Sequence, residues 1–164
     1  MLGSMKTTAI YPGTFDPITL GHIDLVKRTA KMFDHIIVAV ADNKEKATLF
    51  SLEERVDLIK TVFAEINNIT VESFAGLLTD FAKQKNCTII LRGLRVVSDF
   101  DYELQMASMN RKLIPKLETI FLTPNDNYIY VASSLVRTIA KEHGDLSHFV
   151  PPVIEQALKQ KHSS

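Results

Sequence analysis

The chain has 164 residues, of which 46% are hydrophobic and 23% are charged. A chain of this length buries roughly 70% of the surface of its unfolded form, which suffices for one domain with a substantial core, whereas two domains would each be cramped. Nineteen Lys and Arg residues balance nineteen Asp and Glu residues, and this formal net charge of zero argues against a protein that coats nucleic acid.

Cysteine content and the apolar runs indicate a reducing, aqueous compartment. The lone cysteine, Cys87, excludes an internal disulfide and a multi-cysteine metal cluster. The longest strongly apolar stretch, Ile36–Ala41, is too short to span a membrane, and no signal peptide is visible. We therefore expect a cytoplasmic protein that binds no membrane. Residues 1–4 precede a second methionine and are expected to be a vector-derived remnant, which leaves residues 5–164 as a single domain.

Five short apolar segments have the composition of β-strands. The clearest is His35–Ala41, a continuous and largely β-branched run that is typical of a strand covered on both faces. The other four predicted strands are Thr8–Tyr11, Ile69–Phe74, Thr88–Leu91 and Thr119–Leu122.

Helical patterns separate these strands. Apolar residues at helical spacing run from Ile23 to Phe33 and again from Val56 to Ile66, and the second run follows Ser51-Leu52-Glu53-Glu54, which has the form of a capping box. Further helices are predicted at Leu77–Lys85, at Phe100–Leu113, at Ser133–His143 before Gly144, and after Pro151-Pro152. Within Phe100–Leu113, the residues Phe100, Leu104 and Ala107 share a face that Arg111 interrupts.

The alternation of strands and helices predicts the fold class. It indicates an α/β, Rossmann-like domain with a five-stranded parallel sheet and helices on both faces. In such sheets ligands bind beyond the carboxyl ends of the strands. The candidate loops are those after Tyr11, Ala41, Phe74, Leu91 and Leu122.

The first of these loops, Tyr11 to His22, can receive a phosphate. It lacks the G-x-G-x-x-G dinucleotide pattern, but Gly13 allows close backbone approach and Thr14 offers an N–H and a hydroxyl. Gly21 and His22 open the following helix, whose free N–H groups and dipole favour an anion to which His22 can also donate. The alternative is a tight strand-to-helix connection with a solvated histidine.

Three other segments bring cations or hydroxyls to the same edge. The second loop carries Lys44 and Lys46, and the fourth strand ends with Arg92 and Arg95, whose guanidinium groups suit phosphate oxygens. Ser133-Ser134 can hold a terminal phosphate or can be ordinary helix caps. The lysines and arginines can also be solvent-facing, and for Lys44 a solvated surface loop is the preferred interpretation. No residues have the spacing of a catalytic triad or of a protein-held metal site. The combination favours transfer at phosphorus, which depends on positioning and charge stabilisation.

Several strings resemble a known family. Thr19-Leu20-Gly21-His22 matches the (T/H)-x-G-H signature of the nucleotidylyltransferase superfamily, and Ser133-Ser134 with Arg137 resembles its serine-rich motif. The longer strings are Ala9–Pro17, Ser51–Arg55, Arg92–Arg95 and Asp99–Glu103. Together, from about Lys6 to about Leu158, they resemble the bacterial phosphopantetheine adenylyltransferases.

This resemblance implies a reaction and its partners. ATP and 4′-phosphopantetheine would give dephospho-CoA and pyrophosphate with Mg²⁺, in the penultimate step of coenzyme A biosynthesis, by direct in-line attack without a covalent intermediate. The resemblance also implies a homohexamer and feedback inhibition by CoA. Two alternatives are an adenylyl- or cytidylyltransferase for another phosphate, such as nicotinamide mononucleotide or glycerol phosphate, and a non-catalytic nucleotide sensor.

The resemblance also assigns roles to residues. His22 would stabilise the α-phosphate in the transition state, Thr14 would contact both substrates, and Lys46 would hold the attacking phosphate. Arg92 would bind the phosphate of 4′-phosphopantetheine, and Leu78 would line the groove for its arm. The ATP-binding positions would be Thr14, Phe15, His22, Gly93, Leu94, Arg95, Glu103, Tyr128, Ile129, Tyr130, Val131, Ala132, Ser133 and Ser134.

Two of these positions depart from the family pattern. Ala132 stands where the family often has a first serine of three, so that Ser133 and Ser134 must make the phosphate contacts. Tyr128 stands where a tryptophan can occur.

Overall fold

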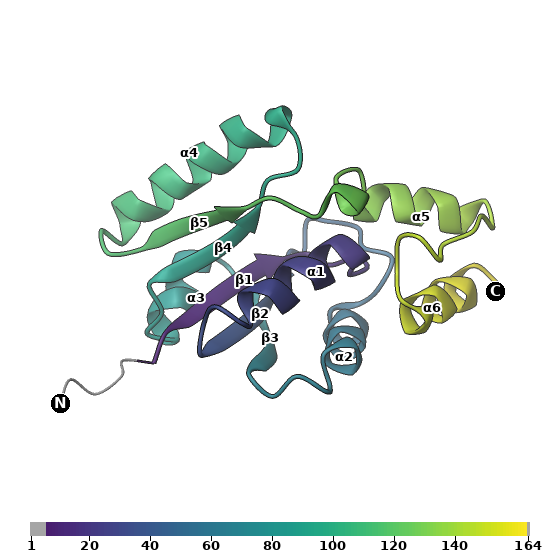
Figure 1. Cartoon of the computed structure of the whole chain (residues 1–164), viewed down its shortest axis with the longest axis horizontal. Helices are drawn as coiled ribbons and strands as arrows, with labels where there is room; N and C mark the ends of the chain where they lie inside the picture. Colours follow the sequence, from purple (N-terminus) through teal and green to yellow (C-terminus); the bar gives the residue numbers. More distant parts are fainter. Residues whose placement is uncertain (1–5, 164) are drawn as a thin grey trace.

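A five-stranded parallel sheet forms the centre of the protein (Figure 1). The computed structural model describes residues 6–163, so the expected remnant at residues 1–4 lies outside the described part of the chain. The strand order is β3-β2-β1-β4-β5, and every pair of neighbours is parallel. The strands are β1 Thr8–Gly13, β2 His35–Asp42, β3 Ile69–Ala75, β4 Ile89–Gly93 and β5 Glu118–Leu122. The predicted α/β, Rossmann-like class is thereby confirmed.

The helices follow the predicted order with shifted ends. They are α1 Leu20–Thr29, α2 Leu52–Val62, α3 Leu78–Gln84, α4 Val97–Leu113, α5 Ser133–Lys141 and α6 Pro152–His162, with a 3₁₀ turn at Asp126–Tyr128. The predicted capping box is present, because the Ser51 side chain accepts from Glu54 N–H and the Glu54 carboxylate accepts from Ser51 N–H. Helix α4 starts three residues earlier than the predicted Phe100.

The end of α5 differs from the prediction for a steric reason. The helix stops at Lys141 instead of His143, and the left-handed backbone conformation is at His143 (φ 56°) and not at Gly144. A Cβ at Gly144 would lie 2.7 Å from the Ile139 side chain, so glycine is needed here for close approach and not for its backbone angles.

The two faces of the sheet are covered by different helices. Side chains of β2 alternate, so that Ile36, Val38 and Val40 pack with α1, α2, α5 and α6, whereas Ile37 and Ala39 pack against α3 on the other face. Helices on both faces, as predicted, leave the carboxyl ends of the strands open for a site. Among the described residues, no helix has the length and apolar character needed to cross a membrane.

Helix α4 lies at the outer margin of the molecule, beside β5 (Figure 1). The described residues do not cover the apolar face noted in the sequence, because Phe100 and Leu104 are 47% and 46% exposed. Val97, Tyr102, Met109 and Leu113 on the same helix are also exposed. This helix therefore leaves an apolar surface facing solvent.

Candidate active site

A cavity of about 1290 Å³ lies at the carboxyl ends of the strands. Central β1 is flanked by β2 on one side and by β4 on the other, which makes the loop after β1 the floor between two groups of loops. Most of the predicted site residues line the cavity: Thr14, Phe15, His22, Lys46, Leu78, Arg92, Gly93, Arg95, Glu103, Tyr128, Val131, Ala132, Ser133 and Ser134.

Three predicted ATP-binding residues are not part of this lining. They are Leu94, Ile129 and Tyr130. The N–H of Leu94 donates to the carbonyl of Leu122 at 2.9 Å, and the Tyr130 side chain is 79% exposed. The structure therefore does not bring these side chains to the cavity.

The orientation of His22 is fixed by the start of α1. Thr19 is the N-cap of this helix, and its side chain accepts from His22 N–H while His22 Nδ1 lies 3.0 Å from Thr19 N–H. The sequence analysis missed this capping box because the usual third-position partner is Glu or Gln. Since an amide N–H only donates, Nδ1 must be the acceptor, and the proton of the neutral ring is on Nε2.

The surroundings of His22 keep the ring neutral. Its ring packs edge-on against that of Phe15, with centroids 5.1 Å apart. Burial, together with the positive charges of Arg95 and Arg92, lowers the pKa of His22 to about 4. At neutral pH, His22 thus offers a hydrogen-bond donor at Nε2 and no charge.

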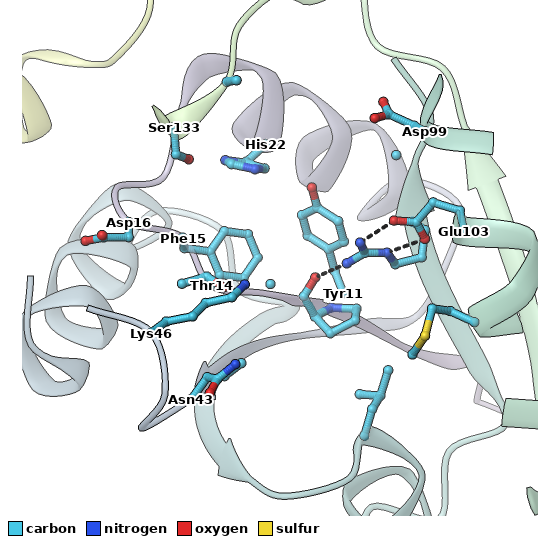
Figure 2. Close-up of a pocket in the computed structure, with 18 of the residues that line it drawn as sticks. Tyr11, Thr14, Phe15, Asp16, His22, Asn43, Lys46, Asp99, Glu103 and Ser133 are labelled. Atoms are coloured by element: carbon cyan, nitrogen blue, oxygen red, sulfur yellow. Dashed lines mark hydrogen bonds and ion pairs between the residues drawn. The ribbon is translucent and has the colours of Figure 1, made fainter. Parts of the chain in front are cut away.

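Arg92 supplies charge, and it is held in place by two partners. Its Nε and Nη2 donate to the two Glu103 carboxylate oxygens at 2.9 and 2.5 Å, and its Nη1 donates to the Pro12 carbonyl at 3.0 Å (Figure 2). A guanidinium has five N–H bonds, so two remain for a ligand. Arg92 at the end of β4 and Arg95 just beyond it both line the cavity, and their ion pairs with Glu103 and Asp99 of α4 were not predicted.

Helix α5 begins at the cavity without a side-chain cap. Its N-cap is Ala132, so the alternative that Ser133 and Ser134 are ordinary caps is wrong. Within the described part of the chain, no acceptor meets the N–H groups of Ser133, Ser134 and Leu135. The hydroxyl of Ser133 donates to the Pro17 carbonyl at 2.8 Å. Free N–H groups at the positive end of a helix form a site for an anion.

Known proteins share the sequence and the geometry of this chain. Residues 10–139 match the cytidylyltransferase-like family. Over 154 residues the chain is 58% identical to the phosphopantetheine adenylyltransferase of Nautilia profundicola, an alignment that covers 94% of this chain and 100% of that protein. The chain belongs to the phosphopantetheine adenylyltransferase family.

Two solved structures have the same fold at low sequence identity. A Plasmodium falciparum nicotinic acid mononucleotide adenylyltransferase superposes with a TM-score of 0.73, at 16% identity, over 95% of this chain and 96% of that one. A Vibrio parahaemolyticus protein assigned as a nicotinate-nucleotide adenylyltransferase superposes with a TM-score of 0.72, at 16% identity, over 96% of this chain and 95% of that one. Both likenesses concern the fold alone.

Lys46 is an exposed member of the predicted site. It lies in the loop between β2 and α2, and its side chain reaches toward the part of the cavity where Thr14 and Phe15 lie (Figure 2). Among the described residues, its ammonium group has no ion-pair partner. Lys46 is therefore available to an anionic ligand.

Some lining residues received no role from the sequence. Tyr102, Met106 and Asn110 lie four residues apart on α4 and form a stripe along the cavity. The four-residue spacing could have predicted this stripe, but the sequence analysis followed the apolar residues Phe100, Leu104 and Ala107, which lie on a neighbouring face of the helix. Asp16 was quoted only as part of a motif, although it is buried in the cavity wall.

Proposed function

We propose that the chain transfers the adenylyl group of ATP to 4′-phosphopantetheine, giving dephospho-CoA and pyrophosphate in the penultimate step of coenzyme A biosynthesis. The observation that carries the proposal is the 58% identity to a phosphopantetheine adenylyltransferase over its whole length. The neutral Nε2–H donor, the two arginines and the uncapped helix that surround one cavity support it.

The reaction is an in-line displacement at the α-phosphorus. A phosphate oxygen of 4′-phosphopantetheine forms the new P–O bond as the bond to the leaving pyrophosphate breaks. The attacking monoester is already ionised at neutral pH, so the enzyme needs neither a general base nor a covalent intermediate. His22 Nε2–H donates to the α-phosphate oxygen on which negative charge grows, and Thr14 contacts both substrates.

The remaining work is to bring two polyanions together. Their repulsion is offset by Lys46 and Arg92 at the acceptor phosphate and by Arg95 at the nucleotide. The open N–H groups of α5, with Ser133 and Ser134, take the terminal phosphates of ATP. The rest of the nucleotide contacts Phe15, Gly93, Glu103, Tyr128, Val131 and Ala132, and Leu78 lines the groove for the pantetheine arm.

Mg²⁺ would be held chiefly by the substrate. Among the described residues, no three His, Cys, Asp or Glu side chains are grouped as metal ligands. The carboxylates at the cavity are engaged: Asp16 with Leu49 and Phe50 N–H, Asp99 with Arg95 and Val96 N–H, and Glu103 with Arg92. This fits an ion that keeps water and phosphate oxygens in its shell and that, when bound, neutralises phosphate charge.

Assembly and regulation belong to the same proposal. Residues 5–164 form one cytoplasmic nucleotidylyltransferase domain that assembles as a homohexamer and is inhibited by CoA. The exposed apolar face of α4 supports assembly, because a surface of this kind is typical of a protein interface. Light scattering during size-exclusion chromatography tests the hexamer, which a monomeric mass would contradict.

Pyrophosphate release from ATP and Mg²⁺ tests the reaction. One reaction contains 4′-phosphopantetheine, a second contains nicotinamide mononucleotide and a third contains no acceptor. We expect release only with 4′-phosphopantetheine. Release only with nicotinamide mononucleotide would mean that the protein is a nucleotidylyltransferase with a different acceptor. No release in any of the three reactions, although ATP binds, would favour the nucleotide sensor.

A further inference from the structure

A buried arginine, Arg55, joins three backbone segments beneath the cavity. It belongs to α2 and is 3% exposed. Its Nη1 donates to the carbonyls of Thr14 at 2.7 Å and Ala41 at 3.0 Å, and its Nε donates to the carbonyl of Phe50 at 3.3 Å. One side chain thus connects the loop after β1, the end of β2 and the residue before the N-cap of α2.

Asp16 connects the same segments from the opposite direction. It is 4% exposed, and its two carboxylate oxygens accept from Leu49 N–H at 2.8 Å and from Phe50 N–H at 2.9 Å. Its own carbonyl accepts from Arg137 Nη1 at 2.6 Å, which ties the first loop to α5 as well. Burial lowers the pKa of the Arg55 guanidinium, and the negative charge of Asp16 partly opposes this shift.

These contacts hold both ends of the loop that carries Lys46. Arg55 binds the chain at Ala41, and Asp16 and Arg55 bind it at Leu49 and Phe50. Between these ends the residues from Asn43 to Ala47 are exposed. Their backbone bonds stay within the turn: Lys46 N–H donates to the Asn43 carbonyl and Glu45 N–H to its side chain, each at 3.1 Å. The position of the loop relative to Thr14 therefore depends on its two ends.

We propose that Arg55 and Asp16 are positioning residues that set the separation of Thr14 and Lys46 and thereby orient the acceptor phosphate for attack. This inference rests on the proposed function, which assigns Thr14 and Lys46 to that phosphate. Packing alone does not require such a pair, because apolar side chains of similar volume are often neutral or stabilising replacements for buried ions. Hydrogen bonds, unlike apolar contacts, are directional, and the donors of Arg55 fix two separate loops relative to each other.

Arg55→Met tests the proposal, because methionine keeps much of the bulk and removes every donor. Steady-state rates are measured with 4′-phosphopantetheine and ATP varied in turn, and ATP binding is measured by calorimetry. We expect kcat/KM for 4′-phosphopantetheine to fall about 10²-fold, the loss typical of a misplaced reacting group, while the Kd for ATP changes less than about threefold.

A double-mutant cycle tests whether Arg55 acts through Lys46. If it does, Lys46→Ala lowers kcat/KM strongly in the unmodified protein and much less in the Arg55→Met protein, because the lysine is already misplaced there. Equal losses in the two backgrounds would overturn the proposal. If Arg55→Met does not fold, Asp16→Asn carries the same cycle, since asparagine keeps the size of the side chain and replaces one acceptor oxygen by a donor.

Asn68→Ala is the matched control. Asn68 Nδ2 also joins separate segments, donating to the carbonyls of Ala30 at 2.7 Å and Phe33 at 3.3 Å, but it precedes β3 at the amino end of the sheet. We expect it to lower Tm and to leave kcat/KM for 4′-phosphopantetheine unchanged. A fall in kcat/KM equal to that of Arg55→Met would show a merely structural role and would overturn the proposal. If the unmodified protein releases no pyrophosphate, that result contradicts the proposed function itself, and the inference fails with it.

Discussion

Among the helices that begin at the cavity, α1 and α5 have first turns that are built in opposite ways. In α1, the N–H of Leu20 donates to the Phe149 carbonyl at 2.8 Å, and the N–H of His22 donates to the Thr19 side chain. In α5, the N-cap is Ala132, and the first N–H groups have no acceptor in the part of the chain that the structure describes. One helix start is closed by the protein and the other is left open.

The difference separates two ways of binding phosphate. Because α1 satisfies most of its own first turn, what it offers a ligand is a side chain, the Nε2–H of His22. Because α5 has no cap, what it offers is its backbone and the positive end of its dipole. The α-phosphate, where charge develops, would thus meet a single fixed donor, and the departing phosphates would meet a set of amides.

Replacing His22 by two different residues separates its two tasks and has the largest expected effect. His22→Gln keeps an acceptor for Thr19 N–H, as in the usual capping box, but puts an amide N–H on a flexible side chain in place of the fixed imidazole Nε2–H. We expect kcat to fall with Tm nearly unchanged. His22→Ala removes the donor altogether, so we expect kcat to fall about 10²–10³-fold and stability to fall by about 1 kcal/mol. Stopped-time product assays and thermal melts measure both, and near-normal turnover of His22→Ala would contradict the catalytic role.

Acid titration tests the closed start of α1 next. The pKa of His22 is about 4 in the folded protein and about 6.5 when unperturbed, so between these values the unfolded state binds the extra proton. The unfolding free energy of the unmodified protein should therefore fall, relative to His22→Gln, by up to about 3 kcal/mol as the pH drops from 6.5 to 4. Urea unfolding across this range measures it, and parallel curves for the two proteins would show that the ring is not held neutral.

Closing the start of α5 would make the two helices alike, with a smaller effect. In Ala132→Asp the carboxylate can accept from the N–H groups of the first turn, and we expect stability to rise by about 1 kcal/mol. ATP affinity should fall about tenfold, because the carboxylate occupies the anion site and repels phosphate. Ala132→Asn is the control, capping without charge. Calorimetry with ATP decides, and equal affinities for the Asp and Asn variants would mean that phosphate does not bind there.

Sequence patterns predicted what depends on local chemistry. The strands, their order along the chain and the Ser51–Glu54 capping box follow from periodicity and cap residues within a few positions of one another. The edge of the sheet that carries the site follows from parallel strands alone. The loop after β1 predicted His22 at the cavity, and the family resemblance predicted Lys46 there; both line it.

The rest depends on which groups meet across the fold. The pairing of Arg92 with Glu103 needs the angle at which α4 leaves β4, and the bonds of Arg55 to Thr14 and Ala41 span 41 and 14 positions of the sequence. Periodicity showed that Phe100 and Leu104 share a face of α4, but it does not say what covers that face. The Thr19–His22 box was missed because a histidine stands where a glutamate is usual.

The fixed proton on His22 has a consequence for how the reaction responds to acidity. A ring that stays neutral down to about pH 4 does not titrate in the range where enzymes of this kind work. The acid limb of turnover then reflects the second ionisation of the acceptor phosphate, near pH 6 for a phosphate monoester. An acceptor analogue with a more acidic phosphate would shift that limb to lower pH without any change in the protein. The pH dependence of the rate is therefore set by the substrate.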